Sequence, residues 1–274
     1  MKRLIRIAVL GVAGRMGQMI VKSIEEDEKV NLIGAAEKQD HTWLGLDVGK
    51  VLLGKPNGII IESDIVNVID SADVVIDFTS PETSLVALKS TAAAKVAHVI
   101  GTTGFSFEEI EKIRLAAQKI PIVRAGNMSL GVNLIAKLTE KVASILDDNF
   151  DIEINEIHHN QKVDSPSGTA LMFGEAAAKG RSLSLDDAKD FNRNGYNGTR
   201  RIGSIGFSSM RGGDIVGEHD VIFAGSGERV ILRHIATDRM VFARGAIRAA
   251  VWASFKDAGE YNMMDVLGLN DSKI

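Results

Sequence analysis

Cysteine does not occur among the 274 residues of the chain. The protein therefore has no disulfide bonds, no thiolate ligands for a metal and no cysteine nucleophile. Dehydrogenases that oxidise aldehydes through a thioester depend on such a nucleophile, so the sequence excludes this class of enzyme.

Long apolar runs and basic blocks are also absent. No stretch approaches the ~20 apolar residues needed to cross a bilayer, so we expect a cytoplasmic protein that does not enter a membrane. The first residues resemble the start of a signal peptide, but Arg6 interrupts the apolar run and Arg15 follows it, which favours a first β-strand. Lys and Arg total 32 against 36 Asp and Glu, a net charge of −4, which argues against non-specific binding of nucleic acid.

The first half of the sequence alternates short apolar segments with helical patterns. Helices are expected at Pro81–Ala94 and Phe107–Gln118, with Ser80 and Ser106 as their N-caps. Strands are expected at Ile5–Leu10, Val30–Ala36, Asp73–Phe78, Ala97–Ile100 and Ile120–Val123. This alternation predicts an α/β fold in which residues 1–129 form a doubly wound, Rossmann-like parallel sheet that binds ligands at the carboxyl ends of its strands.

The pattern changes near residue 130. A helical segment, Leu130–Leu146, leads to an alternating strand at Phe150–His158 and to several strands within Ile202–His234, including a hairpin at Gly225–Gly227. We expect residues 130–239 to form a second, α+β domain on a mixed or antiparallel sheet, and the helical stretch Phe242–Phe255 to bring residues 240–274 back onto the first. Because the second sheet has apolar faces without obvious covering helices, one face is predicted to be buried between subunits.

A glycine loop separates the first strand from its helix. The segment Gly11-Val-Ala-Gly14-Arg-Met-Gly17 would let backbone N–H groups approach a pyrophosphate at a helix N-terminus, where a Cβ would obstruct it. The spacing GxxGxxG is a variant of GxGxxG, and an ordinary tight turn is the alternative interpretation. The preceding strand, the following helix and an acidic residue about twenty positions later favour a dinucleotide site. Its predicted residues here are Gly11, Val12, Ala13, Gly14, Arg15 and Met16.

The acidic residue is Glu37, at the end of the second strand. Its carboxylate is expected to accept hydrogen bonds from the adenosine ribose and so to favour NADH, whereas Lys38 and Arg15 could hold the 2′-phosphate of NADPH. We therefore expect the use of both cofactors, although Lys38 could also be a solvated surface charge. Two later turns at the same sheet edge are predicted to line the nicotinamide, though each alone could be a plain turn: Gly101, Thr102 and Thr103, and Ala125, Gly126, Asn127 and Met128.

Acid–base and anion-binding groups are concentrated between Glu156 and Ala170. His158, His159 and Lys162 supply proton donors, and Ser167-Gly168-Thr169 precedes an alanine-rich helical segment whose first N–H groups would bind a carboxylate. The histidines could instead be buried in the core, or bind a metal with Asp164. Adjacent histidines on an extended segment point to opposite faces, so no metal site is predicted.

At these residues the chain resembles the 4-hydroxy-tetrahydrodipicolinate reductase family. The family motif E-x-H-H-x-x-K-x-D-x-P-S-G-T-A is matched at every fixed position from Glu156 to Ala170. The family also has a GxxGRMG loop, a GTTG turn and an A-x-N-x-S segment, which correspond to residues 11–17, 101–104 and 125–129. Gly126 and Lys38 depart from the proline and arginine common at these positions, which bears on cofactor preference and not on the reaction.

The resemblance implies reduction of a cyclic dicarboxylate by NADH or NADPH with loss of water. It implies that His158 and Lys162 are the acid–base pair, that Lys162 protonates the ring, and that His159, Lys162, Ser167, Gly168 and Thr169 hold the carboxylates. It also implies a homotetramer built through the second-domain sheets. The alternatives are a homoserine dehydrogenase and a protein that senses the NADH pool without catalysing a reaction. Neither accounts for the cluster of residues 156–170.

Overall fold

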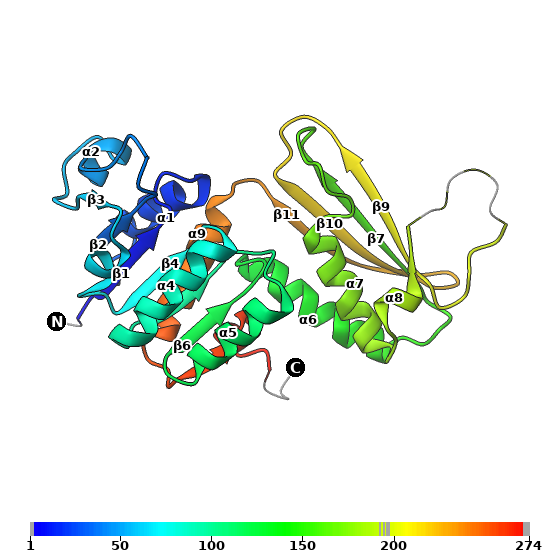
Figure 1. Cartoon of the computed structure of the whole chain (residues 1–274). Coiled ribbons are helices and arrows are strands. Elements are labelled where there is room, and N and C mark those ends of the chain that lie inside the picture. The colour runs from blue at the N-terminus through cyan, green and yellow to red at the C-terminus, as the bar shows by residue number, and fades with distance from the viewer. Residues whose placement is uncertain (1–2, 192, 194, 196–197, 271–274) are drawn as a thin grey trace. The chain divides into compact units, whose positions relative to one another are not determined.

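The computed structural model describes residues 3–191, 193, 195 and 198–270 (Figure 1). The chain forms two compact units. Unit 1 consists of Met1–Leu130 with Met240–Ile274, and unit 2 of Gly131–Arg239. Two distant segments of the sequence therefore make up unit 1.

Unit 1 is built on a seven-stranded sheet whose strand pairs are all parallel. The strand order is β3-β2-β1-β4-β5-β6-β12, so the first six strands have the doubly wound order. The strands are β1 (Ile5–Leu10), β2 (Val30–Ala36), β3 (Ile61–Glu62), β4 (Val74–Asp77), β5 (Ala97–Ile100), β6 (Pro121–Arg124) and β12 (Gly259–Tyr261). The predicted Rossmann-like α/β sheet is confirmed.

Helices cover both faces of this sheet. They are α1 (Arg15–Glu25), α2 (Val48–Leu52), α3 (Ile65–Ile69), α4 (Pro81–Ala94), α5 (Phe107–Ala117), α9 (Met240–Ala253) and α10 (Met263–Leu267). Along β1, Ile7 and Val9 pack in one core cluster with α1 and α9, whereas Ala8 and Leu10 pack in another with α3 and α4. Because both faces are buried, the strand is apolar without interruption from Ile7 to Leu10 instead of alternating.

The two predicted N-caps are confirmed. Ser80 accepts a hydrogen bond from the N–H of Thr83, and Ser106 forms a capping box with Glu109. These caps start α4 and α5 at the predicted residues, so that both helices lead away from the carboxyl end of a strand. The loops preceding them therefore lie at the edge where such sheets bind ligands.

Unit 2 contains a mixed five-stranded sheet in the order β11-β10-β7-β9-β8. Its elements are α6 (Leu130–Ile145), β7 (Asp151–His158), α7 (Gly168–Gly180), α8 (Leu185–Ala188), β8 (Lys189–Asp190), β9 (Ile205–Arg211), β10 (Gly217–Ala224) and β11 (Arg229–Ala236). The β10–β11 hairpin forms at the predicted glycines, where Gly227 has a φ of +86°. The predicted second sheet is thus confirmed, in its mixed form.

The two faces of this second sheet differ in their covering. On one face α7 packs through Phe173, whose ring contacts that of His219 on β10 (Figure 1). On the other face Ile231 and Ile235 of β11 and Met210 of β9 are each about half exposed. By strand register the same face also carries Glu218, Asp220 and Arg233, so the described residues of this side combine half-exposed apolar side chains with charged ones.

Candidate functional site

The glycine loop between β1 and α1 is shaped by close backbone contacts. Gly11 has a φ of +70°, and its N–H and that of Val12 both donate to the carbonyl of Ala36. A Cβ at Gly17 would lie 2.2 Å from the carbonyl oxygen of Gly11, so α1 rests directly on the loop. Gly14 is the N-cap of α1 without a side-chain cap, and the first turn holds no acidic residue. This geometry suits a pyrophosphate at the positive end of the helix dipole.

Glu37 lies beside the same loop. Its carboxylate accepts hydrogen bonds from the N–H of Ala13 and from the N–H of Lys38, both 2.9 Å long. The carboxylate predicted to bind the ribose is thus held next to the glycine loop by two backbone N–H groups. Lys38 and Arg15 have exposed side chains, as a group that holds a 2′-phosphate requires.

The loops after β4 and β5 are joined by a buried polar network. Asp77 Oδ1 accepts from the hydroxyl of Thr79 at 2.6 Å and from that of Thr102 at 3.3 Å, and Ser84 donates to Thr102. His98 Nε2 lies 3.4 Å from Asp77 Oδ2, and both side chains are fully buried. Burial raises the pKa of Asp77, but the neighbouring His98 and the hydroxyls of Ser84 and Thr79 outweigh it and lower the pKa below its usual value.

The other residues predicted to bind the cofactor differ in how much of their side chain is exposed to solvent. The side chains of Val12, Thr102 and Met128 are buried, so these residues offer a ligand only backbone atoms. Gly101 and Ala125 are partly buried, and the N–H of Ala125 donates to Ile100. The exposed or partly exposed members are Ala13, Gly14, Arg15, Met16, Thr103, Gly126 and Asn127.

The predicted cluster in unit 2 is centred on Glu156, which is 1% exposed. Arg211 binds its carboxylate with two hydrogen bonds of 2.8 Å, and His158 Nδ1 lies 2.6 Å from Oε2. The N–H of Ser167 donates to Oε1 at 3.2 Å. Burial raises the pKa of Glu156, but Arg211 and His158 outweigh it and lower the pKa to about 2. Glu156 is therefore ionised.

Ser167 is the N-cap of α7, and its hydroxyl is engaged within the fold. The oxygen accepts from the N–H of Ala170 and lies 3.0 Å from His219 Nε2. Burial, followed by the charge of His158, lowers the pKa of His219 to about 3, so this imidazole is neutral near neutral pH. Since Ser167 is 2% exposed, its side chain builds the turn, whereas Gly168 and Thr169 in the first turn of α7 are more accessible.

Lys162 and His159 lie in the loop between β7 and α7. Lys162 Nζ is 2.7 and 2.8 Å from the two carboxylate oxygens of Asp164, so the two side chains form a hydrogen-bonded ion pair. This hydrogen bond lowers the pKa of Asp164. The N–H of His159 donates to Ile215, and the side chain, unlike that of His158, is partly exposed.

The predictions from the sequence do not include the support that Glu156, Arg211 and His219 give this cluster through their contacts with His158, Glu156 and Ser167 respectively. Glu156 and His158 are two residues apart on a strand and so share a face, a signal present in the sequence. The others arrive through strand pairing, Arg211 opposite His158 and His219 opposite Glu156.

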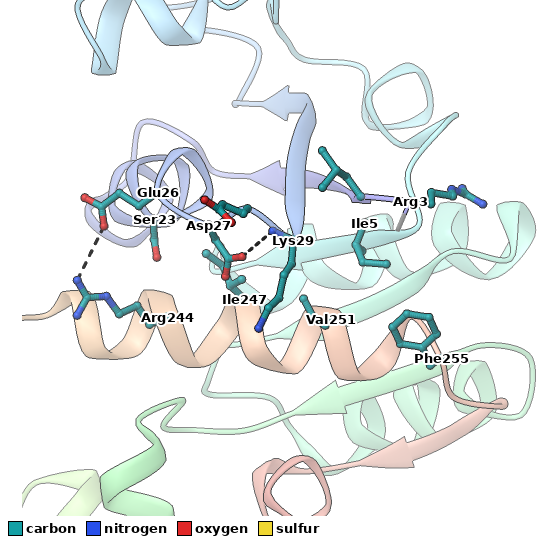
Figure 2. A pocket seen from close by; sticks show the side chains of 12 residues that line it. Arg3, Ile5, Ser23, Glu26, Asp27, Lys29, Arg244, Ile247, Val251 and Phe255 are labelled. Carbon is teal, nitrogen blue, oxygen red and sulfur yellow. Dashed lines mark hydrogen bonds and ion pairs between the residues drawn. The ribbon is translucent and has the colours of Figure 1, made fainter. Parts of the chain in front are cut away.

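A separate cavity of about 770 Å³ lies in unit 1 beside α9 (Figure 2). Ile247, Val251 and Phe255 line it from α9 and the segment that follows, Arg3 from the residues before β1, and Ile5 from the first position of β1. It thus lies at the amino end of β1, the opposite end of the strand from the glycine loop. Ligands of such sheets bind at the carboxyl ends, so this cavity is not the nucleotide site.

Among the residues that the structure describes, no helix is both long and apolar enough to span a membrane. Within residues 3–191, 193, 195 and 198–270, no group of three or more histidine, aspartate or glutamate side chains is arranged to hold a metal ion.

The doubly wound sheet with its glycine loop, together with the acid–base cluster of unit 2, defines an oxidoreductase that uses NADH or NADPH. Comparison with known proteins identifies the family. The family models "Dihydrodipicolinate reductase, N-terminus" and "Dihydrodipicolinate reductase, C-terminus" match residues 5–128 and 131–267. The chain belongs to the dihydrodipicolinate reductase family.

Individual relatives agree with this assignment. A 4-hydroxy-tetrahydrodipicolinate reductase of Ruegeria sp. (strain TM1040) is 53% identical over 96% of this chain and 98% of its own length. The enzyme of the same name from Brucella abortus (strain 2308) is 51% identical over 96% and 99%. A solved dipicolinate-bound dihydrodipicolinate reductase from Paenisporosarcina sp. TG-14 is 24% identical, with a TM-score of 0.77 over 96% of this chain and 99% of that one, and thus has the same fold.

Proposed function

We propose that the protein reduces 4-hydroxy-2,3,4,5-tetrahydrodipicolinate to tetrahydrodipicolinate, with loss of water, in the biosynthesis of diaminopimelate and lysine. The observation that supports this most directly is the cluster of unit 2, where His158 with its Glu156 partner, Lys162 and the start of α7 come from one continuous motif. The relatives of this name match the chain over nearly its whole length.

In this proposal the residues of the cluster divide the chemistry. Lys162 protonates the ring and His158 is its acid–base partner. A cation beside a dianionic substrate favours binding and also stabilises negative charge that develops on the ring. His159 and the N–H groups of Gly168 and Thr169 hold the carboxylates, and Ser167 contributes by capping the helix that presents them.

Residues 1–129, with 240–274, would bind the dinucleotide, and residues 130–239 would bind the substrate and form the subunit contacts. The bound NADH or NADPH supplies the hydride. The glycine loop would receive the pyrophosphate, while Glu37 would bind the ribose of NADH, and Lys38 and Arg15 the 2′-phosphate of NADPH.

For the assembly and location we propose a cytoplasmic homotetramer. The support is the open face of the second sheet, where Ile231, Ile235 and Met210 are about half exposed, because apolar side chains on one sheet face are usually covered by a partner. Light scattering tests this, and a stable monomer at the concentration of the activity assay would contradict it.

The reaction is tested by mixing the protein with the freshly made aldolase product of pyruvate and aspartate semialdehyde and following NADH absorbance. Lys162→Met should lower kcat by about 10²–10⁴-fold, the usual contribution of a proton-transfer group. Thr169→Val should act mainly on KM. Lys179→Met, which removes a lysine paired with Glu140 on the same unit, is the matched control. A near-normal kcat in a folded Lys162→Met variant would contradict the catalytic role proposed for Lys162. If the unchanged protein gave no turnover, the proposed reaction would be wrong.

A further inference from the structure

The environment of His158 constrains the position of its protons. Glu156, held by Arg211, lies 2.6 Å from Nδ1 of the ring. An ionised carboxylate is only an acceptor, so a hydrogen bond of this length requires a proton on Nδ1. The neutral ring therefore carries its proton on Nδ1 and its lone pair on Nε2.

The Nε2 side of the ring packs closely against a glycine. A Cβ at Gly217 would lie 2.9 Å from His158 Nε2 and 3.3 Å from Cδ2. Gly217 does not have a positive φ, so the close approach of the ring, and not the backbone conformation, is what favours glycine here.

Arg211 connects this arrangement to the loop that carries Lys162. Besides its two bonds to Glu156, it donates at 2.7 Å to the carbonyl of Asp164, the residue whose side chain pairs with Lys162. One guanidinium therefore holds both the carboxylate partner of His158 and the loop of the second acid–base group.

We propose that Glu156, Arg211 and Gly217 are positioning residues for proton transfer: Glu156 holds His158 in the Nδ1–H form, so that Nε2 is the nitrogen that gives and takes the proton. When Nε2 donates, the proton passes to its acceptor and a neutral Nδ1–H imidazole remains; when Nε2 accepts, the imidazolium forms. The inference rests on the acid–base role proposed for His158.

The charged groups around His158 set the direction of the pH effect. Burial lowers the pKa of His158, Glu156 raises it, and the cations Lys162 and Arg211 lower it. His219, whose ring lies 5.0 Å away, is neutral in the working range, and Asp164 faces Lys162. Removing the charge of Glu156 must therefore lower the pKa of His158.

The variant Glu156→Gln tests this with a pH–rate profile. One limb of the plot of kcat against pH reports the titration of His158 and should be absent in His158→Gln. In Glu156→Gln this limb should move to lower pH, whether His158 acts as acid or as base. At the same time kcat near neutral pH should fall by about 10-fold to 100-fold, which is less than the 10²–10⁴-fold effect of removing a proton-transfer group itself. Glu153→Gln is the matched control, because Glu153 lies on the same strand, pairs with Arg200 at 2.8 Å and points to the opposite face. In this control the limb should not move. An unmoved limb in a folded Glu156→Gln variant would overturn the proposal.

A second measurement uses the unchanged protein and needs no substrate. In protein labelled with ¹⁵N-histidine, the signal absent from His158→Gln belongs to His158, and its nitrogen shifts at high pH report the tautomer. The Nδ1–H form is expected. The Nε2–H form would overturn the inference even if turnover is observed, whereas an Nδ1–H form without turnover would refute only the proposed function.

Discussion

The substitution Gly17→Ala should separate the glycine loop from helix α1. The added Cβ would lie 2.2 Å from Gly11 O, 2.7 Å from Val12 Cα and 2.9 Å from Gly11 C. These are backbone atoms and cannot rotate away, so the helix and the loop must move apart by more than about 1 Å to restore ordinary contact. The N–H groups that would face the pyrophosphate move with them.

Two quantities follow from this displacement. A misplacement of about 1 Å in a site can cost roughly 10²-fold, so NADH should bind about 100-fold more weakly, near 3 kcal/mol of binding free energy. Overpacking should also lower the free energy of unfolding by about 1–3 kcal/mol. Calorimetric titration with NADH and thermal unfolding measure the two effects separately.

Gly14→Ala provides the graded comparison within the same loop. Its Cβ would meet one atom, Gly11 O, at 3.1 Å, a contact that a small adjustment relieves. The loss of NADH affinity should therefore be much smaller than in Gly17→Ala. If Gly17→Ala bound NADH as tightly as the unchanged protein, or if Gly14→Ala were the more damaged variant, the contact between α1 and the loop would not shape the cofactor site.

Two further predictions concern charge. Lys38→Met should weaken the binding of NADPH by about 1–3 kcal/mol and leave the binding of NADH nearly unchanged. Glu37→Ala should raise KM for NADH more than KM for NADPH. Equal effects of either substitution on both cofactors in steady-state kinetics would contradict these assignments. The pKa of His219 is about 3 in the folded protein against 6.5 in a model compound, so the unfolded chain binds the additional proton between these values. The stability associated with neutral His219 is thus fully present above pH 6.5 and is lost as pH falls toward 3. In denaturant titrations across this range His219→Gln should lose less stability on acidification than the unchanged protein, and an equal loss would rule out His219 as a source of acid sensitivity.

The parallel sheet was predictable because its strands are buried on both faces and therefore stand out as apolar segments. The bounds of β2 and β5 agree with those expected from the sequence. By contrast, β12 is the segment Gly259-Glu-Tyr261, which has no β-branched residue and is a strand because it pairs with Pro121–Val123 of β6. Tertiary pairing of this kind leaves no local signal.

The same distinction applies to the candidate site. His158 and Lys162 are four residues apart, so their proximity could be expected from the sequence alone. Arg211 is brought to Glu156 by the parallel register of β7 and β9, and His219 by the antiparallel register of β7 and β10. A one-residue change in either register would move these side chains to the other face of the sheet, and one sequence does not specify which strands pair.

The division of unit 1 into two chain segments has a consequence for synthesis. Helix α9 supplies buried residues such as Ala246 and Ala250 to the core beneath β1, yet all of unit 2 is made before it. At ~5–20 residues per second this interval lasts roughly 5–20 s, during which we expect the part of the sheet that α9 covers, at β4, β5 and β6, to lack this helix. A truncated protein ending at residue 239 should accordingly be cut by protease in unit 1 and resist in unit 2, and equal resistance of both would refute the expectation. Unit 1 is then the first part of the protein to leave the ribosome and the last to be completed.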